Sequence, residues 1–231
     1  GTFSITSSVL ADDIYTLTVR ATDLAGNVSA ESVGLPIEID ATAPTQPTIT
    51  TDIALTKINT PTITGTAEAG STVELFNGSD SLGTVVAADD GSFSITPTLG
   101  DSDYVLTVTA TDEAGNTSAP SIGLPITIDT TAPAAPTSVQ TSASITNDIT
   151  TLSITGTAEA GSTVNLLNGI TVIGTVNADD TSGAFTIVPS TALGEGDYNL
   201  TVTATDQAGN TSDPSTRIPI TIDTTAPTQP V

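Results

Sequence analysis

Apolar and polar residues alternate along most of this chain. Over 104–111, one face of the segment carries Tyr104, Leu106, Val108 and Ala110, and the other face carries mostly threonine. An alternation with a period of two predicts a β-strand that buries one of its faces. Shorter rows follow the same pattern, namely Ile63 with Gly65 and Ala67, Val73 with Leu75, Phe93 with Ile95, and Ile126 with Ile128. Because no segment shows a convincing amphipathic helical period, the pattern predicts an all-β protein.

Three motifs recur along the chain at a spacing of about 90 residues. ATDLAGNVS at 21–29 returns as ATDEAGNTS at 110–118 and as ATDQAGNTS at 204–212. GTAEAGSTV at 65–73 returns unchanged at 156–164, and IDATAP returns twice as IDTTAP. A period of this length is too long for a solenoid and fits a small domain used in tandem.

The motifs divide the chain into two complete units and two partial ones. We expect complete immunoglobulin-like domains over 44–132 and 133–226. Residues 1–43 correspond to the C-terminal half of such a domain, because GTFSIT at the start matches GSFSIT at 91–96. Residues 227–231 correspond to the start of a further repeat. About seven short strands per unit, separated by Gly, Asp and Pro turns, predict antiparallel β-sandwiches arranged in tandem as a rod, the first one truncated.

The aromatic residues fit an immunoglobulin-like sandwich. Tyr15, Tyr104 and Tyr198 each open the penultimate strand of a unit, just after an acidic turn. A tyrosine corner occupies that place in immunoglobulin-like domains. The cysteine pair and the buried tryptophan of antibody domains are absent, so we expect a core held by aliphatic packing alone.

The composition narrows the chemistry that this chain can perform. Of 231 residues, 26 are Asp or Glu and 3 are Lys or Arg, which gives a formal charge of −23, and there is no His, Cys, Met or Trp. The chain therefore lacks disulfides, thiolate nucleophiles, imidazole bases and the usual ligands of zinc. Its negative charge argues against nucleic acid or an anionic membrane as a partner. No apolar run approaches the roughly 20 residues of a membrane-spanning helix, and the first residues do not resemble a signal peptide.

Carboxylates gather in loops that a seven-stranded sandwich brings to one end. In such a sandwich, the loops after the second, fourth and sixth strands meet where the chain enters the domain. The first of the resulting clusters contains Asp40, Glu68, Asp89, Asp90 and Asp112, and the second contains Asp129, Glu159, Asp179, Asp180 and Asp206. Turn acids from the far end of the preceding unit can join them, namely Asp12 and Asp13 for the first cluster and Asp101 and Asp103 for the second.

These clusters predict a bound divalent cation. Two unit charges 4 Å apart repel by about 4 kcal/mol at an effective dielectric constant of 20. No Lys or Arg is available in the sequence to offset that repulsion, since the only cations are Arg20, Lys57 and Arg217. Calcium accepts about six to eight oxygen ligands in flexible geometry, whereas magnesium requires a tighter octahedron. We therefore expect one or more calcium ions at each junction between consecutive units. The leading ligands are Asp40 and Asp129, which lie in the linkers that join these units. The alternative is ordinary turn formation, because Asp and Asn side chains bond the local backbone without a metal.

The motifs GTAEAGSTV, ATDxAGNxS and ITIDTTAP together resemble the bacterial immunoglobulin-like (BIg) repeats of giant Gram-negative surface adhesins. The resemblance covers essentially the whole chain. It implies long rods of tandem domains, stiffened by calcium at the domain borders, exported by type I secretion and adhesive near one tip. In this chain Asp40, Asp129 and Asp223 match the junction motif of the family, and Glu68, Asp89, Asp112, Glu159, Asp179 and Asp206 match its loop acids.

The expected function is therefore a structural one at the bacterial cell surface, as a stalk segment that projects an adhesive tip and serves virulence. The expected partners are the adjacent repeats of the same chain, in a monomeric rod, and a host receptor or glycan reached through the parent protein. The alternative is a module that itself binds a host glycan or receptor. Such a module needs exposed aromatic side chains, and most of the 3 Tyr and 4 Phe lie on inward rows. An enzyme is not expected, because repetition argues against a unique catalytic site.

Overall fold

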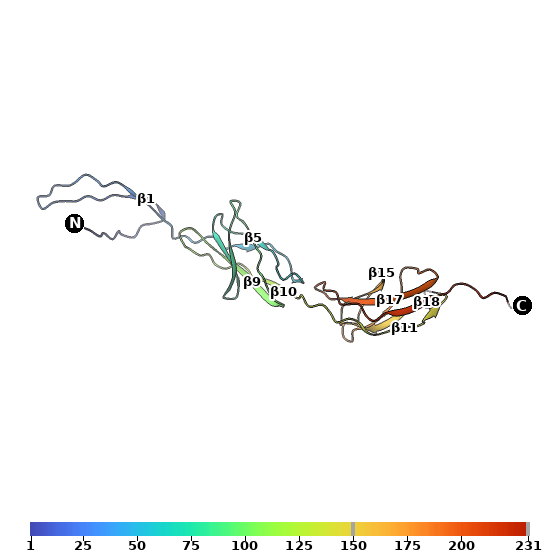
Figure 1. The fold of residues 1–231 in the computed structure, drawn as a ribbon. Coiled ribbons are helices and arrows are strands. Elements are labelled where there is room, and N and C mark those ends of the chain that lie inside the picture. Colours follow the sequence, from blue (N-terminus) through green and yellow to red (C-terminus); the bar gives the residue numbers. More distant parts are fainter. Residues whose placement is uncertain (149–150, 230–231) are drawn as a thin grey trace. The chain divides into compact units, whose positions relative to one another are not determined.

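The computed structural model describes residues 1–148 and 151–229. Every element named in these residues is a β-strand, and Figure 1 accordingly shows arrows and no coiled ribbon. The all-β prediction is therefore confirmed. No helix in the described part of the chain has the length and apolarity needed to cross a bilayer. The predicted start of a further repeat, 227–231, extends into residues 230–231, which lie outside the described residues.

The chain divides into two compact units. The first comprises residues 1–52, 62–97 and 104–125, and the second comprises residues 53–61, 98–103 and 126–231. The domain boundaries proposed from the motifs differ from this division in detail and stay predictions.

One sandwich is built from two sheets that share an aliphatic core. Its three-stranded sheet has the order β3 (Thr48–Ile49), β5 (Ile63–Thr66) and β8 (Ser92–Ile95). Its five-stranded sheet has the order β4 (Leu55–Thr56), β10 (Leu124–Ile128), β9 (Ser102–Thr111), β6 (Thr72–Asn77) and β7 (Asp80–Val86). Antiparallel pairing sets Val73 opposite Ala110 and Leu75 opposite Val108. All four side chains are fully buried, so the inward rows expected from the alternation are confirmed.

The same arrangement of two sheets recurs in a second sandwich, which lies in the second compact unit. The three-stranded sheet has the order β11 (Thr137–Thr141), β13 (Ile154–Thr157) and β16 (Ala184–Ile187). The five-stranded sheet has the order β12 (Ile145–Thr146), β18 (Ile218–Ile222), β17 (Gly196–Thr205), β14 (Thr163–Asn168) and β15 (Thr171–Asn177). One core cluster takes side chains from both sheets, among them Ile154, Phe185, Leu166 and Val202. The tandem sandwich prediction is thus confirmed.

Two pairings depart from the antiparallel prediction. The strand β4 pairs with β10 in parallel, with Leu55 opposite Thr127, and β12 pairs with β18 in the same way. The reason is that the first strand of each sandwich is shared between the sheets. Its first part, β3, runs antiparallel to β5, and its second part, β4, continues along the edge of the other sheet.

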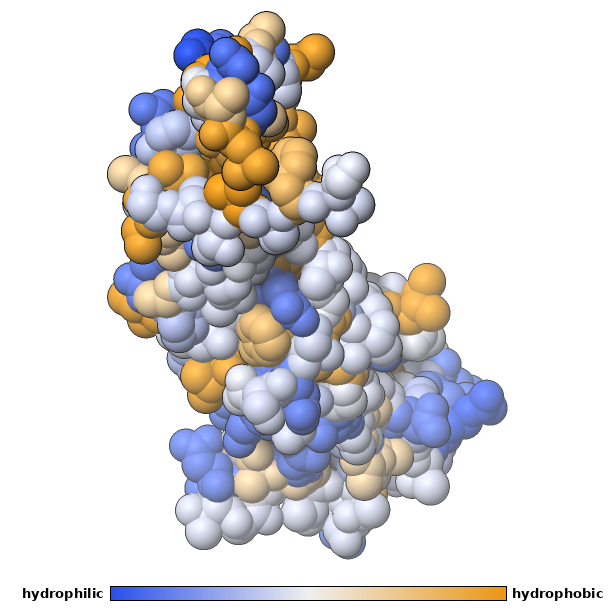
Figure 2. All heavy atoms as spheres, turned by 90° about the vertical axis from the view of Figure 1, so that its left-hand side faces the viewer, coloured by the Kyte–Doolittle hydropathy of each residue, from blue (hydrophilic) through white to orange (hydrophobic). Residues whose placement is uncertain are grey.

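Residues 1–43 form a hairpin without a sandwich. Its strands β1 (Asp13–Leu17) and β2 (Leu35–Ile39) pair with each other and with no other strand in the described residues. Phe3 is 74% exposed, whereas Phe93, its counterpart in the next repeat, is 5% exposed. Other exposed apolar side chains of this segment are Ile5, Val9, Leu24 and Val33, and Figure 2 shows apolar residues, in orange, on the face that it presents.

A tyrosine corner closes the acidic turn before the penultimate strand. The hydroxyl of Tyr198 donates a hydrogen bond to the carbonyl oxygen of Gly194 at 3.0 Å, and Tyr15 does the same to Ala11. These two bonds confirm the expected placement at Tyr15 and Tyr198.

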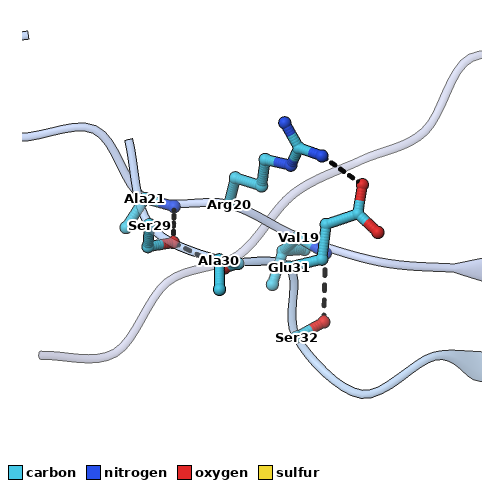
Figure 3. Close-up of polar contacts among 7 residues, drawn as sticks. All are labelled: Val19, Arg20, Ala21, Ser29, Ala30, Glu31 and Ser32. Carbon is cyan, nitrogen blue, oxygen red and sulfur yellow. Dashed lines mark hydrogen bonds and ion pairs between the residues drawn. The ribbon is translucent and has the colours of Figure 1, made fainter. Parts of the chain in front are cut away.

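Serine hydroxyls continue the strand ladder after the ATDxAGN turn. The amide of Ala110 donates to Oγ of Ser118 at 3.0 Å, and that hydroxyl donates to the carbonyl oxygen of Ala119 at 2.9 Å. Figure 3 shows the equivalent contacts of Ser29 in the hairpin, beside an ion pair of Arg20 with Glu31 at 2.6 Å. Both ionic side chains are more than half exposed, so the pair adds little stability.

Candidate metal centre

The ATDxAGN motif folds into a closed turn whose acid and amide bind each other. In the copy at Asp206–Asn210, the amide of Asn210 donates to Oδ1 of Asp206, and Nδ2 donates to Oδ2, both at 2.8 Å. Gly209 adopts φ +91°, a left-handed conformation that favours glycine. The spacing of Asp, Gly and Asn in the motif therefore follows from the turn itself.

The asparagine of this turn also holds the linker. Nδ2 of Asn210 donates to the backbone carbonyl oxygen of Asp129 at 2.8 Å, and Asn210 is 8% exposed. In the preceding copy, Nδ2 of Asn116 donates to the carbonyl oxygen of Asp40 at 3.1 Å. This role of the asparagines was not among the expectations from the motifs, although their recurrence in all three motifs was a signal.

The structure brings three acids of the second cluster to one depression. Asp129, Glu159 and Asp206 line a hollow of about 210 Å³. The carboxylate of Asp180 lies beside the same loop, because a Cβ added to Gly161 would be 3.4 Å from its Oδ1. Four of the five expected acids are thus near this place.

The first cluster is assembled less completely. Asp40 lines a hollow of about 250 Å³ together with Glu38 and Glu113, two acids that were not among the expected ligands. Asp112 binds Asn116 within its own turn. Glu68 and Asp89 do not line this hollow.

Other expected ligands serve as turn acceptors. Oδ1 of Asp90 accepts the amide of Ser92 at 2.9 Å, and Oδ1 of Asp179 accepts the amide and the hydroxyl of Ser182 at 2.7 and 2.8 Å. Within residues 1–148 and 151–229, no three carboxylates lie close enough together to hold a metal ion. Among the described residues, several of the expected acids therefore lie near one another without forming a ligand group for a metal ion.

The turn acid Asp101 forms a latch on the linker. Its carboxylate accepts the amide of Thr130 at 3.0 Å, the hydroxyl of Thr130 at 2.7 Å and the hydroxyl of Thr131 at 2.7 Å. Asp103 accepts the hydroxyl of Thr127 at 2.5 Å. The latch recurs elsewhere, since Thr42 donates to Asp12, and Thr224 and Thr225 donate to Glu195. Asp13 instead accepts the amide of Ile14.

The family model for bacterial Ig-like domains matches residues 46–130 and 131–224. The chain belongs to the bacterial Ig-like domain family. This establishes the family expected from the motifs, and the particular adhesin type stays a proposal.

Curated relatives of this bacterial Ig-like chain include two hydrolases. Exoglucanase B of Cellulomonas fimi is 33% identical over 248 residues, which cover 97% of this chain and 22% of the relative. Chitinase A1 of Niallia circulans is 35% identical over 133 residues, which cover 52% of this chain and 18% of the relative. The chain thus spans about a fifth of the length of these relatives.

Similar solved structures include modules of two bacterial proteins. The fibronectin(III)-like modules of Clostridium thermocellum CbhA are 22% identical, with a TM-score of 0.47 over 77% of this chain and 94% of that chain. A Ca²⁺-stabilized adhesin with which an Antarctic bacterium binds ice is 24% identical, with a TM-score of 0.42 over 93% of this chain and 58% of that chain. At these scores the likenesses carry no argument about function.

The acids of the Ig-like repeats are of the chemical type that a hard cation prefers. Their positions among the described residues do not form a group of ligands for one ion. Carboxylate and carbonyl oxygens are the ligands that calcium prefers, and the acids of the second hollow offer only such atoms. Both carboxylate oxygens of Asp206 already accept bonds from Asn210.

Acid should weaken the linker latch. Hydrogen bonds from the hydroxyls of Thr130 and Thr131 and from the amide of Thr130 hold the pKa of Asp101 below its ordinary value. Since the folded state lowers this pKa, the latch stabilises the fold above the ordinary Asp pKa, and this stability is lost as pH falls through the lowered value, below about pH 4. Between pH 5 and 8 we expect a flat profile, because the chain has no His.

Thermal unfolding from pH 7 to pH 2 checks this expectation. Asp101→Asn should show a shallower acid decline than the unaltered chain, because the variant has no carboxylate to protonate at the latch. Asp213→Asn, at an exposed acid outside the latch, is the matched control. Equal acid slopes for the Asp101 variant and the unaltered chain would contradict the role of the latch.

Proposed function

We propose that this chain is a stalk segment of a bacterial surface adhesin, in the manner of the giant type I-secreted non-fimbrial adhesins. The observation that carries the proposal is the near interchangeability of the repeats. They share an identical nine-residue stretch at 65–73 and 156–164. They also share the order of their sheets and the asparagine contact to the linker. A stalk needs many equivalent units, whereas an enzyme needs one unique site.

Calcium is part of the proposal. The acids that line the hollow at Asp129 come from the linker and from two loops of the following repeat, so a bound ion would tie these segments together. Weak extracellular calcium modules have dissociation constants of about 10⁻⁴–10⁻³ M. At millimolar calcium such a site stabilises the folded state by roughly 0.4–1.4 kcal/mol. The contribution is small for one site and large over many repeats.

The location and the partners follow from this function. The stalk stands outside the cell, at the bacterial surface, and contacts the adjacent repeats of its own chain. A host receptor or glycan is bound by another part of the parent protein. The repeats themselves carry no catalytic role, since their acids serve turns and linkers.

Asp129→Ala tests the calcium part of the proposal. The variant removes one carboxylate from the hollow but keeps the backbone carbonyl that accepts the bond from Asn210. We expect calcium to raise the unfolding temperature of the unaltered chain relative to chelator, and the Ala variant to lose most of that rise. Calorimetry with calcium and with chelator measures both effects.

Asp213→Ala removes an equal charge away from the hollow and should keep the calcium response. If calcium leaves the unfolding temperature and the length in small-angle scattering unchanged, the calcium proposal fails and the fold assignment stands.

A second candidate is a spacer within a polysaccharide hydrolase. It is favoured by the 33% identity to exoglucanase B over 97% of this chain. In that case the repeats would separate a catalytic domain from other modules of the same protein. Hydrolysis of cellulose or chitin by the full-length protein would select this candidate over the adhesin.

A further inference from the structure

Lys57, one of three basic residues in the chain, bonds the ATDQAGN turn. Its Nζ donates to the carbonyl oxygen of Gly209 at 2.6 Å. Lys57 directly follows β4, and both residues belong to the second compact unit. Neither the motifs nor the calcium proposal assigns this lysine a role.

The lysine side chain lies along the turn. A Cβ added to Gly209 would be 3.8 Å from Nζ, 3.9 Å from Cε and 4.0 Å from Cδ of Lys57. The equivalent Gly115 in the preceding copy of the turn has no such neighbour within 4 Å. Two copies of one turn thus differ in whether a lysine covers them.

The contact closes a ring of hydrogen bonds. The amide of Asp129 donates to the carbonyl oxygen of Thr56 at 3.0 Å. The carbonyl oxygen of Asp129 accepts Nδ2 of Asn210 at 2.8 Å, and the neighbouring Gly209 accepts Lys57. Because Lys57 directly follows Thr56, the ring links β4, the linker and the turn. The ring holds the turn at two points, through Lys57 and through Asn210. Each of these hydrogen bonds therefore limits the motion of the turn that would break the other.

The charge of Lys57 suits this place. The turn begins with Asp206, which lines the hollow with Asp129 and Glu159. An ammonium group bonded to this turn adds positive charge to a part of the chain that is rich in carboxylates, and thereby lowers their mutual repulsion. The partner of Lys57 is a carbonyl oxygen, so this contact is a hydrogen bond and not an ion pair. Among the described residues, the only ion pair is that of Arg20 with Glu31.

We propose that Lys57 is a positioning residue that latches the Asp206–Asn210 turn onto β4 and the linker without a bound metal ion. This inference rests on the proposed function in one respect, since the turn belongs to the candidate calcium site. It implies that the junction is partly assembled before calcium arrives. In the following repeat Asn147 occupies the position of Lys57, so the device is a property of one repeat and not of the motif.

Amide hydrogen exchange in the presence of chelator tests the contact of Lys57 with the Asp206–Asn210 turn. Lys57→Met keeps the apolar stem and removes the ammonium, so the amides of Asp206 and Asn210, which close the turn, should exchange roughly three- to tenfold faster. Lys57→Arg retains a cationic donor and should stay within about twofold of the unaltered chain. The turn at 112–116 is the internal control and should not change.

Arg217→Met removes the same charge elsewhere and separates the local contact from a general charge effect. Exchange in Lys57→Met no faster than in Arg217→Met would overturn the latch. If Lys57→Met exchanges faster than Arg217→Met in chelator and calcium then slows its exchange, both the Lys57 contact and the calcium proposal are supported. If calcium alters no variant while Lys57→Met still exchanges faster in chelator, the calcium proposal fails and the latch stands.

Discussion

Gly65→Ala is expected to destabilise the sandwich around β5 by about 3 kcal/mol or more, and thus to lower its unfolding temperature by roughly 12–24 °C. Gly65 lies on β5, where the inward row passes beneath Phe93. A Cβ at this position would collide with the carbonyl oxygen of Thr48, and would lie 2.6 Å from Cε1 of Phe93. The carbonyl group of Thr48 cannot move away without disturbing the pairing of β3 with β5. The collision therefore cannot be relieved by a small local shift.

Calorimetry measures the effect directly, and the chain provides a matched control. Gly100→Ala adds the same methyl group at a place where no atom lies within 4 Å of the new Cβ. Its unfolding temperature should stay close to that of the unaltered chain. The same collision exists at Gly156, where a Cβ would be 2.7 Å from Cζ of Phe185. A Gly65 variant that melts together with the Gly100 variant would show that the packing of Phe93 is not as described.

Asn210→Ala is expected to cost about 1–3 kcal/mol of unfolding free energy. The substitution removes both Nδ2 bonds, one to the carboxylate of Asp206 and one to the carbonyl oxygen of Asp129. The Asn210 side chain is buried, so water replaces these bonds poorly. The backbone amide of residue 210 still donates to Asp206, and the turn itself should survive.

The control for this variant is the same turn without a linker contact. Asn27 binds Asp23 within an exposed turn, with bonds at 2.8 Å from its amide and from Nδ2. Asn27→Ala should therefore change the unfolding free energy of the sandwiches very little. Denaturant unfolding in chelator compares the two variants without any contribution from calcium. Equal free energies for both would contradict the role of Asn210 in holding the linker.

The sequence by itself determined the strands and the family. The alternation over 104–111 placed Leu106, Val108 and Ala110 in the core, because a strand has only two faces and one of them is buried. The recurring motifs indicated tandem Ig-like domains. Each motif recurs with the same residues because the turn, as at Asp206–Asn210, needs its acid, glycine and asparagine in that order. Local geometry therefore explains why these features could be read without a structure.

Only the tertiary structure decided which acids come together and what they bind. Asp101 and Asp179 were expected near a metal, yet their oxygens accept bonds from nearby threonine and serine groups. The contacts of Asn210 with Asp129 and of Lys57 with Gly209 join residues 81 and 152 positions apart. A sequence pattern records the period of a strand and the chemistry of a turn, but such distant pairs depend on how sheets pack and how the linker leaves its domain.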